Sequence, residues 1–585
     1  MIKEPDLSSN QYIKRFDRST FSGAEEFTFI GDGRLGGKAL RFALIIEKIV
    51  TQYRTNKDFP ITVNIPRLTV ITTECFDLFL EQNNLYDTAF STRISDKEKA
   101  KVFLQADLPQ DLTEDLQAYV KKIRTPLAVR SSSLMEDSLD FPFAGIYQTK
   151  MIPNNQRSSK IRLRILSDAI KLIYASTFFI NARCAMKASS INFKDEKMAV
   201  IIQEVVGLQH HNRFYPNISG VARSYNFYPT GHSKPEDGVV SLALGLGKAI
   251  VEGGTVWTYS PEYPEVNPPY DSINQMLEQT QLDFWAVNMG KLPTDNPLND
   301  SEYLVRLTIK DAEKDNTLGY IASTYDFESD RINIGIGFGG SRIINFAPLL
   351  QVDLLPVNQL IKSLLKICEK CFGSKVEMEF AVTFEPGNKL SPRFALLQIR
   401  PMRISRDEVE VNESLLTPER VFAYSDNVMG NGNVGQIKDI VYVKPETFDH
   451  KNSAKIAHEI ETFNHKLVSE NRQFLLLGFG RWGSSNPWWG IPVNWGQICG
   501  AKVIVESTIP GTTGVLSQGS HFFHNMTNLK ILYFSIKEGG KYPIDWNWLR
   551  KQEVINEGKY VNHVRLTSPL TIKADGRKRK GIILK

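Results

Sequence analysis

The sequence has few of the features that mark secreted or membrane proteins. Five cysteines in 585 residues are too few for a disulfide framework. No stretch comes near the roughly 18 uninterrupted apolar residues of a membrane-spanning helix. The first residues, Met1-Ile-Lys-Glu-Pro-Asp, also lack the apolar segment of a signal peptide. We therefore expect a cytoplasmic protein with no membrane partner.

The sequence also has little excess of positive over negative charge. The formal net charge is only +5, so composition gives no argument for a nucleic-acid partner. The densest basic run, Arg577 to Lys580, lies between Asp575-Gly576 and an apolar segment, which predicts the turn of a terminal hairpin. The Cys368-x-x-Cys371 pair has no second pair or histidine close by in the sequence. We interpret these cysteines as core thiols, not as a metal or redox site.

At about 150 residues per domain, this length predicts three or four units. Helical and strand-like segments alternate through residues 25–400, which predicts mixed α and β structure. The clearest segments are a helix over 39–50, a strand over 126–129, helical structure over 159–187 and a strand over 197–206. Composition changes after Met402, because six of the eight tryptophans follow it (Trp482, Trp488, Trp489, Trp495, Trp546 and Trp548). This change predicts a domain boundary near residues 403–415.

The first candidate binding motif is Gly31-Asp-Gly33-Arg-Leu-Gly36-Gly37-Lys38. It contains Gly-x-Gly-x-x-Gly before a predicted helix, but nothing else supports a dinucleotide site. It is not a Walker A loop, because Ala39 replaces the Ser or Thr of that motif. A glycine loop, a helix N-terminus and a lysine suit a phosphate. A plain loop at the start of a helix remains the alternative.

The second segment is Ala128-Val-Arg130-Ser-Ser-Ser, with Glu136-Asp137, Phe143-Ala-Gly145 and Thr149 after it. An arginine at a strand end, followed by hydroxyl groups and glycine, offers donors to an anion. The two carboxylates would repel that anion unless they position a metal or the arginine. A surface loop is the alternative.

The third segment predicts a β-hairpin with charged residues at one end. Glu377-Met-Glu379 begins one alternating strand and Gln398-Ile-Arg400 ends the next, with turn residues centred near Asn388. Alternation puts each pair on one face, and both pairs lie at the end remote from the turn. Two carboxylates, an amide oxygen and an arginine gathered there suit a divalent cation and its bound phosphates. A charged solvent-facing edge is the alternative.

In order, these segments resemble the ATP-binding domain of the phosphoenolpyruvate synthase and pyruvate phosphate dikinase family. The collinear resemblance rests on Gly36-Gly37-Lys38, Ile71-Thr-Thr73, Val129-Arg-Ser-Ser132, Glu136-Asp137, Phe143-Ala-Gly145, Gln203, Ser219-Gly-Val-Ala222, Gly245-Leu-Gly247, Glu377-Met-Glu379 and Leu397-Gln-Ile-Arg-Pro401. It spans residues 31 to about 403. The ordered set is more specific than any single match.

The resemblance implies an α+β, ATP-grasp-like fold in which two subdomains close over ATP and Mg²⁺. We expect a first subdomain over 1–195, a second over 196–403, and a separate C-terminal α/β domain over 404–585. The implied nucleotide and phosphate contacts are Lys38, Arg130, Gly145, Gln203, Gly245, Gly247 and Arg400. The implied metal residues are Glu379 and Gln398 as ligands and Glu377 as their support. Arg130 and Arg400 would also act in phosphoryl transfer.

Two departures from the family limit what the resemblance implies. Lys248 follows Gly245-Leu-Gly247 where the family has a glutamate. No Gly-Gly-x-Thr-Ser-His-Ala-like phosphohistidine motif occurs, and the residues after Met402 are fewer than the roughly 250 of a pyruvate-binding barrel. We therefore expect no complete dikinase reaction within these residues.

The phosphoryl acceptor is left open between His521, a histidine of a partner protein and a small molecule. His521 lies in a Gly-Ser-His context faintly like the missing motif, and such an imidazole can carry phosphate. A partly buried structural histidine is the alternative. The leading hypothesis is an Mg²⁺-dependent ATP phosphotransferase. The others are a nucleotide-sensing regulator that binds ATP without transferring phosphate, and an ATP-grasp ligase forming an acylphosphate.

Overall fold

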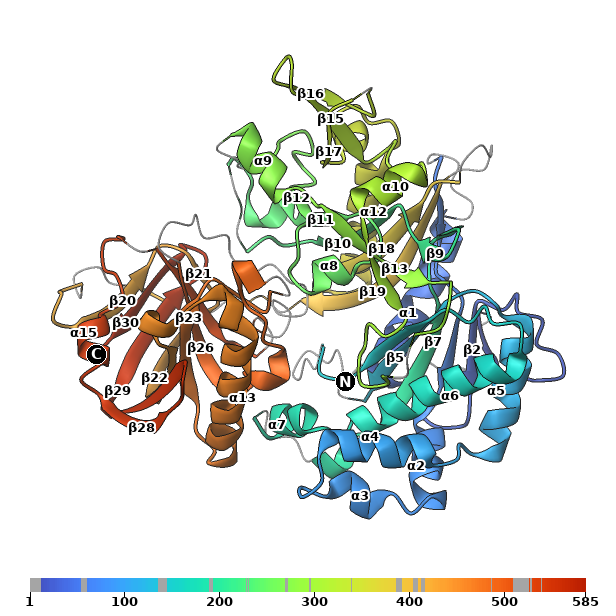
Figure 1. The fold of residues 1–585 in the computed structure, drawn as a ribbon, viewed down its shortest axis with the longest axis horizontal. Coiled ribbons are helices and arrows are strands. Elements are labelled where there is room, and N and C mark those ends of the chain that lie inside the picture. The colour runs from blue at the N-terminus through green and yellow to red at the C-terminus, as the bar shows by residue number, and fades with distance from the viewer. Residues whose placement is uncertain are drawn as a thin grey trace.

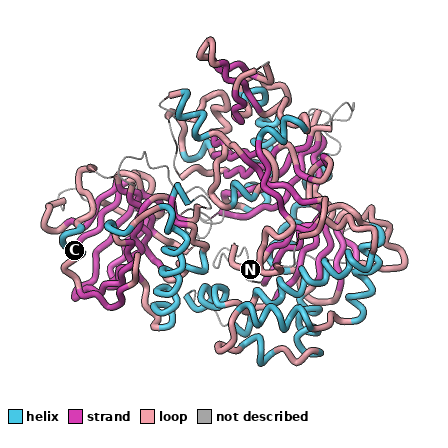
Figure 2. The backbone as a smooth tube through the Cα atoms, viewed as in Figure 1, coloured by secondary structure: helices cyan, strands magenta, loops and turns pink. Residues whose placement is uncertain are grey.

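The structure is a computed structural model. It describes residues 12–53, 60–134, 145–188, 193–227, 229, 231–268, 272–293, 296–337, 339–385, 392–402, 404, 409–411, 416–484, 487–508, 526, 529–537 and 539–585. Helices and strands are mixed along this part of the chain, in several sheets (Figure 2). This agrees with the α+β content expected of a nucleotide-binding domain. None of the helices in the ranges above is long and apolar enough to cross a bilayer.

The first sheet has six strands and is covered by helices (Figure 1). In spatial order its strands are β1 (Ile13–Arg15), β2 (Phe27–Ile30), β4 (Leu68–Ile71), β7 (Met198–Glu204), β5 (Leu127–Ser133) and β6 (Thr149–Ile152). The helices beside it are α2 (Thr73–Gln82), α3 (Tyr86–Phe90), α4 (Asp96–Gln105), α5 (Gln110–Lys122), α6 (Ser159–Ser176) and α7 (Ile180–Ala188). The predicted strands at 126–129 and 197–206 and the predicted helical region at 159–187 are confirmed.

Hydrophobic spacing explains these elements. Helix α5 buries Leu112, Leu116, Tyr119 and Val120, a spacing that makes one apolar stripe on a helix. Strand β5 is buried at every position except Arg130, which is partly exposed. A strand enclosed on both faces reads as a continuous apolar or small-residue run, so Arg130 stands out as the polar exception in the middle of the sheet.

The second sheet also has six strands and contains the predicted hairpin. Its order is β12 (Trp257–Tyr259), β11 (Val239–Ala243), β10 (Ile218–Arg223), β18 (Lys375–Thr383), β19 (Arg393–Met402) and β3 (Thr62–Asn64). Helix α12 (Val357–Phe372) packs on it and buries Leu360, Leu364 and Cys368. Cys368 is thus a core thiol, and Cys371 is partly buried.

Helix α1 and the strands β3 and β7 link the two six-stranded sheets along the chain. Helix α1 (Gly36–Tyr53), predicted over 39–50, packs its apolar face into the same core as the second sheet. Strand β3 precedes residue 196 but completes the second sheet, whereas β7 follows residue 195 but lies between β4 and β5 of the first. The sheets therefore do not divide in sequence at residues 195 and 196.

Two smaller sheets are formed by strands between Leu208 and Ile344. One has the order β14 (Leu304–Thr308), β13 (Asp283–Asn288), β9 (Arg213–Tyr215) and β8 (Leu208–His210), and the other β16 (Arg331–Ile334), β15 (Ala322–Asp326) and β17 (Ser341–Ile344). Short helices connect them: α8 (Lys248–Val251), α9 (Ile273–Gln279), α10 (Ile309–Lys314) and α11 (Ala347–Leu350).

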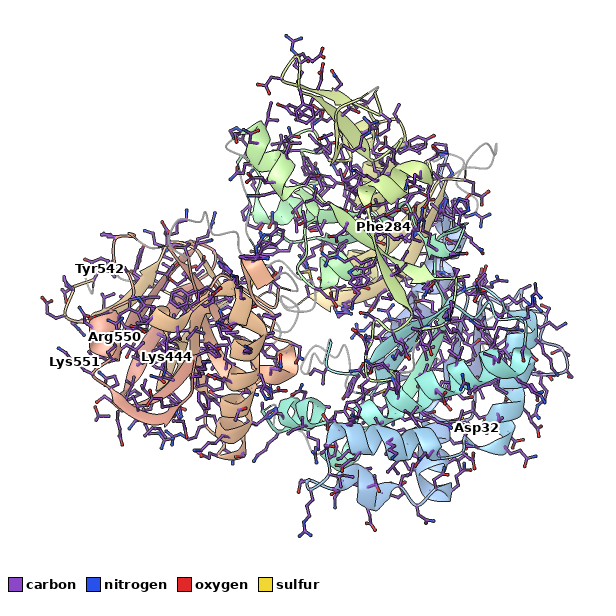
Figure 3. The ribbon with its side chains drawn as sticks, viewed as in Figure 1. Asp32, Phe284, Lys444, Tyr542, Arg550 and Lys551 are labelled. Carbon is purple, nitrogen blue, oxygen red and sulfur yellow. The ribbon has the colours of Figure 1, made fainter. Side chains whose placement is uncertain are left out.

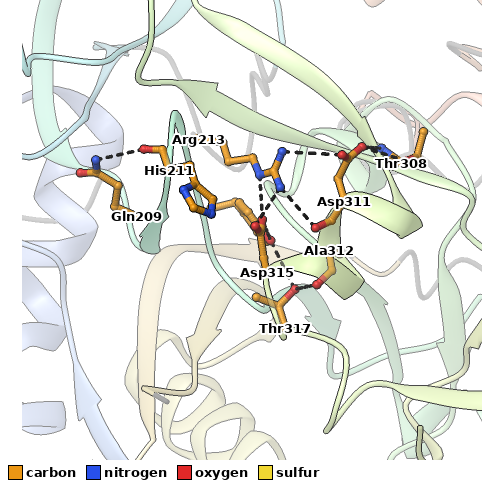
Figure 4. A network of polar contacts seen from close by, with 9 residues as sticks. Gln209, His211, Arg213, Thr308, Asp311, Ala312, Asp315 and Thr317 are labelled. Carbon is orange, nitrogen blue, oxygen red and sulfur yellow. Dashed lines mark hydrogen bonds and ion pairs between the residues drawn. The ribbon is translucent and has the colours of Figure 1, made fainter. Parts of the chain in front are cut away.

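A polar network fixes the four-stranded sheet to the end of α10 (Figure 4). Arg213 forms two hydrogen bonds with Asp315, with Nε–Oδ2 at 2.7 Å and Nη2–Oδ1 at 2.8 Å. The Tyr215 hydroxyl donates to the same carboxylate at 2.7 Å. A bidentate arginine pair of this kind is geometrically specific, so it holds β9 in one position relative to α10.

The C-terminal region, residues 416–585, contains a nine-stranded mixed sheet. Its order is β20 (Val421–Ser425), β30 (Lys580–Leu584), β29 (Val561–Asp575), β22 (Asn431–Val443), β23 (Phe474–Phe479), β26 (Ala501–Ser507), β27 (Leu532–Ile536) and β21 (Val428–Met429), with β28 (Glu553–Glu557) also paired to β29. β22, β23, β26 and β27 run parallel, and α13 (Ser453–Ser469) connects the first two. β29 and β30 form an antiparallel pair closed at Asp575 and Lys580, which confirms the predicted terminal hairpin.

The C-terminal region packs against the first sheet's helices through α7, α13 and the 3-10 turn η8 (Trp495–Gln497) (Figure 1). The sulfur atoms of Cys184 and Cys499, both free and buried, lie 3.0 Å apart across this contact. The amide of Asn464 donates to Cys184 Sγ across the same contact at 3.5 Å. Apolar residues of both parts form one continuous core, so the C-terminal region is firmly docked.

Candidate functional site

A cavity of about 840 Å³ lies where the two six-stranded sheets and the C-terminal region meet. Arg130 of β5, Gln203 of β7 and Glu379 of β18 line it, together with Gly145 and Gly247. These are five of the residues that the sequence singled out. Its volume is in the range of small-molecule and cofactor sites.

The hairpin of β18 and β19 brings the predicted charged residues together. Glu377 pairs in register with Arg400, and Glu379 with Gln398. The predicted side-by-side placement is confirmed, while its predicted turn at Asn388 lies outside the described residues. The register then shifts between Glu379 and Phe380. A bulge of this kind re-aims local groups, and here the Leu397 carbonyl, at the extra residue, accepts a hydrogen bond from Arg130 Nη1 at 3.5 Å.

Arg130 bridges the two sheets at the cavity. One guanidinium nitrogen, Nη2, donates to Gln398 Oε1 and lies 3.5 Å from Glu379 Oε2. The other, Nη1, is 3.5 Å from Gln203 Oε1. The side chain therefore faces a carboxylate, two amide oxygens and a carbonyl, and it remains partly exposed to the cavity. The N–H groups of this guanidinium could donate to phosphate oxygens in place of these partners.

Behind this surface lies a buried ionic cluster. Glu377 is 2% exposed and Arg400 is 1% exposed, and neither lines the cavity. Arg223 Nε contacts Glu377 at 2.7 Å, and Arg400 Nη2 lies 3.3 Å from Glu379 Oε1. Among the described residues, three arginines, counting Arg130, face these two carboxylates. The positive charge that Arg130 presents at the cavity favours an anionic ligand.

The glycine loop before α1 lies against β5. The backbone at Gly36 has φ of +76° and presses on Ser132, so a side chain there would overlap the Ser132 backbone. The Ala39 N–H donates to Ser132 Oγ at 3.2 Å, and Lys38 Nζ donates to Ser131 Oγ at 3.4 Å. Lys38 is therefore held one residue along the strand from Arg130, but it does not line the cavity.

The second glycine loop, residues 245–247, follows β11 and forms part of another wall of the cavity. Gly245 has φ of +80°, and a Cβ there would come within 2.6 Å of Phe284, which lies among the interior side chains (Figure 3). The Ser219 hydroxyl donates to the Gly245 carbonyl at 2.6 Å. This packing presents Gly247 to the cavity, while Gly245 itself is set back.

Lys248, the base that replaces a family glutamate, lines the cavity and is held by two acids. It forms ion pairs with Glu252 and, at 3.2 Å, with Asp300. Burial alone would lower the lysine pKa, but the attraction of Glu252 and Asp300 outweighs burial and raises the pKa of Lys248. The positive charge of Lys248 is therefore offset by the carboxylates of Glu252 and Asp300.

One end of the cavity is apolar. Met151, Val205, Leu246 and Leu304 line it and belong to one small hydrophobic cluster. Gln203, 2% exposed, borders these residues, and its Nε2 is buried without a hydrogen-bond partner in the described part of the chain. A buried donor without a partner is costly, so this amide is suited to a polar atom on a flat, otherwise apolar ligand.

The hairpin oxygens fit a magnesium ion brought in by a phosphorylated ligand. Glu379 offers a carboxylate at the cavity and Gln398 an amide oxygen beside it. No group of three or more His, Cys, Asp or Glu side chains forms a metal cluster within the described ranges. Magnesium in proteins is commonly held by one or two carboxylates and the substrate's phosphates, and the donors here match that pattern. Glu377 is buried against Arg223 and Arg400 and does not line the cavity.

Several expected residues lie outside the described part of the chain. They are Glu136, Asp137, Phe143, Ala144 and His521. Other residues at the site were not predicted, namely Arg223, Lys150, Asp300 and Glu302. Arg223 had a detectable signal, because it directly follows the predicted Ser219-Gly-Val-Ala222 segment at the end of strand β10. The Lys150–Glu302 ion pair, at 2.9 Å, had none, because its partners are 152 residues apart.

Comparison with known protein families matches residues 33–420 to the family described as pyruvate phosphate dikinase, AMP/ATP-binding domain. The match covers well over half of the chain, including both six-stranded sheets from Gly33 onward and every described residue of the ionic cluster. It supports ATP as a ligand of these residues.

Proposed function

We propose, on the premise that this chain belongs to the pyruvate phosphate dikinase AMP/ATP-binding domain family, that it is an Mg²⁺-dependent ATP phosphotransferase. The observation that carries this proposal is the hairpin cluster, whose carboxylate, amide and arginine contacts converge on the cavity beside Arg130. We also propose an ATP-grasp-like arrangement for subdomains 1–195 and 196–403, in which β3 and β7 each complete the sheet of the other subdomain. Residues 404–585 would form a separate C-terminal domain.

The adenine would occupy the apolar end of the cavity. Met151, Val205, Leu246 and Leu304 offer the flat apolar walls that a purine requires. Gln203 and the backbone after it would supply the polar contacts at the purine edge. Lys248 would lie nearby, and its charge would be offset by its two acidic partners.

The phosphates would extend from this end toward Arg130. In the structure, Arg130 donates to the Gln398 oxygen and faces Glu379. Phosphate oxygens compete well for such a guanidinium, so nucleotide binding would draw Arg130 away and expose the two hairpin oxygens. Lys38 would approach the same phosphates, and Gly145 and Gly247 would let backbone come close to them.

Glu379 and Gln398 would hold the magnesium ion that arrives with ATP. When bound, the ion neutralises charge that develops on the phosphates during transfer. Arg400 orients Glu379 from behind and, with a change of rotamer, would reach the transferred phosphate. Glu377 keeps Arg400 in place through the buried ion pairs.

A nucleotide-sensing regulator that does not transfer phosphate is the second candidate. It is favoured by Lys248, which stands at the cavity in place of the family's acid, and by the missing phosphohistidine motif. The acceptor of the leading proposal would be a small molecule, a partner's histidine or His521.

The two functions are separated by following labelled phosphate. The full chain would be incubated with Mg²⁺ and ATP labelled at the β or γ position, and the products and any acid-labile protein phosphate identified. We expect transfer of label beyond free phosphate. Tight calorimetric binding of Mg²⁺–ATP with no label transfer to any added acceptor would favour the regulator, and absence of nucleotide binding would reject both.

A further inference from the structure

A second, smaller cavity adjoins the apolar end of the cavity described above, which we call the main cavity. The second cavity has a volume of about 380 Å³, enough for a small molecule. Phe214 and Met289 line it. Both belong to the hydrophobic cluster of Val205 and Leu246 at the apolar end of the main cavity. Glu204 lines both cavities. We call this second space the rear cavity.

The walls of the rear cavity come from two different sheets. One wall belongs to the first six-stranded sheet, with Arg67 just before β4, the loop 122–126 before β5, and Glu204 at the end of β7. The other wall belongs to the four-stranded sheet, with Phe214 in β9 and Met289 just after β13. The rear cavity therefore lies where these two sheets meet.

Two adjacent asparagines after β6 hold both walls in place. The buried Asn154 donates through Nδ2 to the carbonyls of Ile123 and Thr125, each at 3.0 Å. Asn155 donates through Nδ2 to the Met289 carbonyl at 2.8 Å. These bonds fix the loop 122–126 and the end of β13 relative to one another. The rear cavity is therefore preformed, as small-molecule sites usually are.

Three cationic side chains gather in the rear cavity. The Arg67 guanidinium donates to the Gly23 carbonyl. A Cβ at Gly23 would lie 3.5 Å from Lys122 Cβ, so the Lys122 side chain begins beside the residue that Arg67 contacts. Arg124, two residues further along the loop, lines the same space. The chain thus brings a lysine and two arginines to one wall.

These cations are open to a ligand. The Arg67 side chain is 41% exposed, and Lys122 and Arg124 are also exposed. Of the described residues that line the rear cavity, only Glu204 is acidic, and it pairs with Arg67 at 2.9 Å. Lys122 and Arg124 have no acidic partner among these lining residues. Positive charge in a concave space favours an anionic ligand.

The charges of the rear cavity match a phosphate monoester. The described lining residues carry three positive charges and one negative charge, and a phosphate monoester has a charge close to −2 above about pH 7. Arginine and lysine donors form strong charge-assisted hydrogen bonds with phosphate oxygens. Phe214 and Met289 on the other wall offer apolar surface to the carbon skeleton of such a ligand.

We propose that the rear cavity binds a small organic phosphate, with its phosphate group against Arg67, Lys122 and Arg124 and its carbon skeleton against Phe214 and Met289. This ligand is distinct from ATP and from the phosphoryl acceptor, and the inference does not depend on the phosphotransferase proposed above. A phosphate monoester fits better than a nucleoside triphosphate, because the rear cavity has less than half the volume of the main cavity.

Calorimetry on the full chain tests this assignment. The probe is phenyl phosphate at about pH 8, where its phosphate is doubly charged. Benzyl alcohol, which has a similar ring and no charge, is the comparison. The chain is first saturated with Mg²⁺ and β,γ-methylene-ATP, so that the main cavity beside Arg130 is occupied. We expect one equivalent of phenyl phosphate to bind and benzyl alcohol not to bind measurably.

Two double variants locate the bound probe. Lys122→Ala with Arg124→Ala removes two cations of the rear cavity and should weaken phenyl phosphate binding about tenfold or more, because charge-assisted contacts are lost. Lys121→Ala with Arg157→Ala is the matched control, because both side chains are exposed and neither lines the rear cavity. The control should bind within about twofold of the parent. Both double variants should unfold at the parent's temperature, since exposed substitutions cost little stability.

Four results would overturn the assignment. They are no binding of phenyl phosphate, equal binding of benzyl alcohol, the same affinity in both double variants, and binding that β,γ-methylene-ATP abolishes. The last result would place the probe in the main cavity. The comparison of the two double variants holds whether or not the nucleotide binds, so a failure of the phosphotransferase proposal is not mistaken for a failure of this one.

Discussion

Of the described hairpin carboxylates, Glu379 lines the cavity, whereas Glu377 is buried behind it against Arg223 and Arg400. We predict that Glu379→Gln weakens Mg²⁺-dependent ATP binding about tenfold, because a charge-assisted contact becomes a neutral one. Binding without Mg²⁺ should change much less. The matched control is Glu385→Gln, just beyond the far end of the same strand and paired with Arg393. Equal losses with and without Mg²⁺ in calorimetry would contradict a metal role.

Arg400 is buried between Glu377 and Glu379, so its removal affects stability as well as turnover. We predict that Arg400→Ala lowers the free energy of unfolding by about 3 kcal/mol, since a buried carboxylate loses a partner. Arg393→Ala removes an arginine from the same strand whose side chain is 53% exposed, and should cost less than about 1 kcal/mol. Urea unfolding of both variants measures the difference, and similar values would contradict the buried cluster.

Turnover of Arg400→Ala is then compared with its nucleotide affinity in conditions where the variant is folded. If Arg400 reaches the phosphate only during transfer, turnover falls more than affinity. A parallel fall of both would place its contribution in binding.

At the scale of elements, the loop between β13 and β14 is tied across the cavity to β6. Lys150 of β6 pairs with Glu302 of this loop at 2.9 Å, and their side chains are 3% and 4% exposed. Lys150 also donates to the Asn299 carbonyl, and the neighbouring Leu298 and Asp300 line the cavity. The loop therefore forms a strap between the first six-stranded sheet and the four-stranded sheet.

We predict that Glu302→Ala destabilises the protein by about 3 kcal/mol, because Lys150 is left buried without its carboxylate, and that it weakens ATP binding. Asp283→Ala breaks an exposed pair with Arg306 between β13 and β14 and should cost less than about 1 kcal/mol. Unfolding and calorimetry on both variants provide the measurement. A stable Glu302→Ala with unchanged ATP affinity would show that the strap does not position the loop.

The β18–β19 hairpin shows what a local sequence pattern can and cannot predict. Alternation and turn residues predicted that Glu377 and Glu379 would face Arg400 and Gln398, because register in a hairpin follows from period two. The bulge after Glu379 was not predictable, since no glycine or proline marks it. It decides that the Leu397 carbonyl meets Arg130.

Pairings between distant segments lay beyond the sequence pattern. β3 reads like any short strand, and nothing local indicates that it joins β19, more than 300 residues later. The same holds for β7 between β4 and β5, and for Lys150 with Glu302. Such contacts depend on how whole sheets assemble, which periodicity does not encode.

At the scale of the whole molecule, the C-terminal region is both a folding partner and a wall of the site. Its core is continuous with that of the first sheet's helices, and Pro492–Trp495 line the cavity. The composition change after Met402 indicated a boundary but not this contact. The residues proposed to contact the nucleotide all precede Met402, so nucleotide binding should depend little on this wall.

The close approach of Gly496 to Asn181 allows this dependence to be tested. A Cβ at Gly496 would overlap the Asn181 side chain, so we predict that Gly496→Val separates η8 from α7 and loosens the C-terminal region. Gly435→Val is the matched control, because a Cβ there meets nothing within 4 Å. Small-angle scattering should show a larger radius of gyration for Gly496→Val only. Calorimetry should show Mg²⁺–ATP affinity within about threefold of the parent, because the residues proposed to contact the nucleotide all precede Met402. An unchanged radius of gyration would mean that the contact between α7 and η8 is not what holds the two parts together.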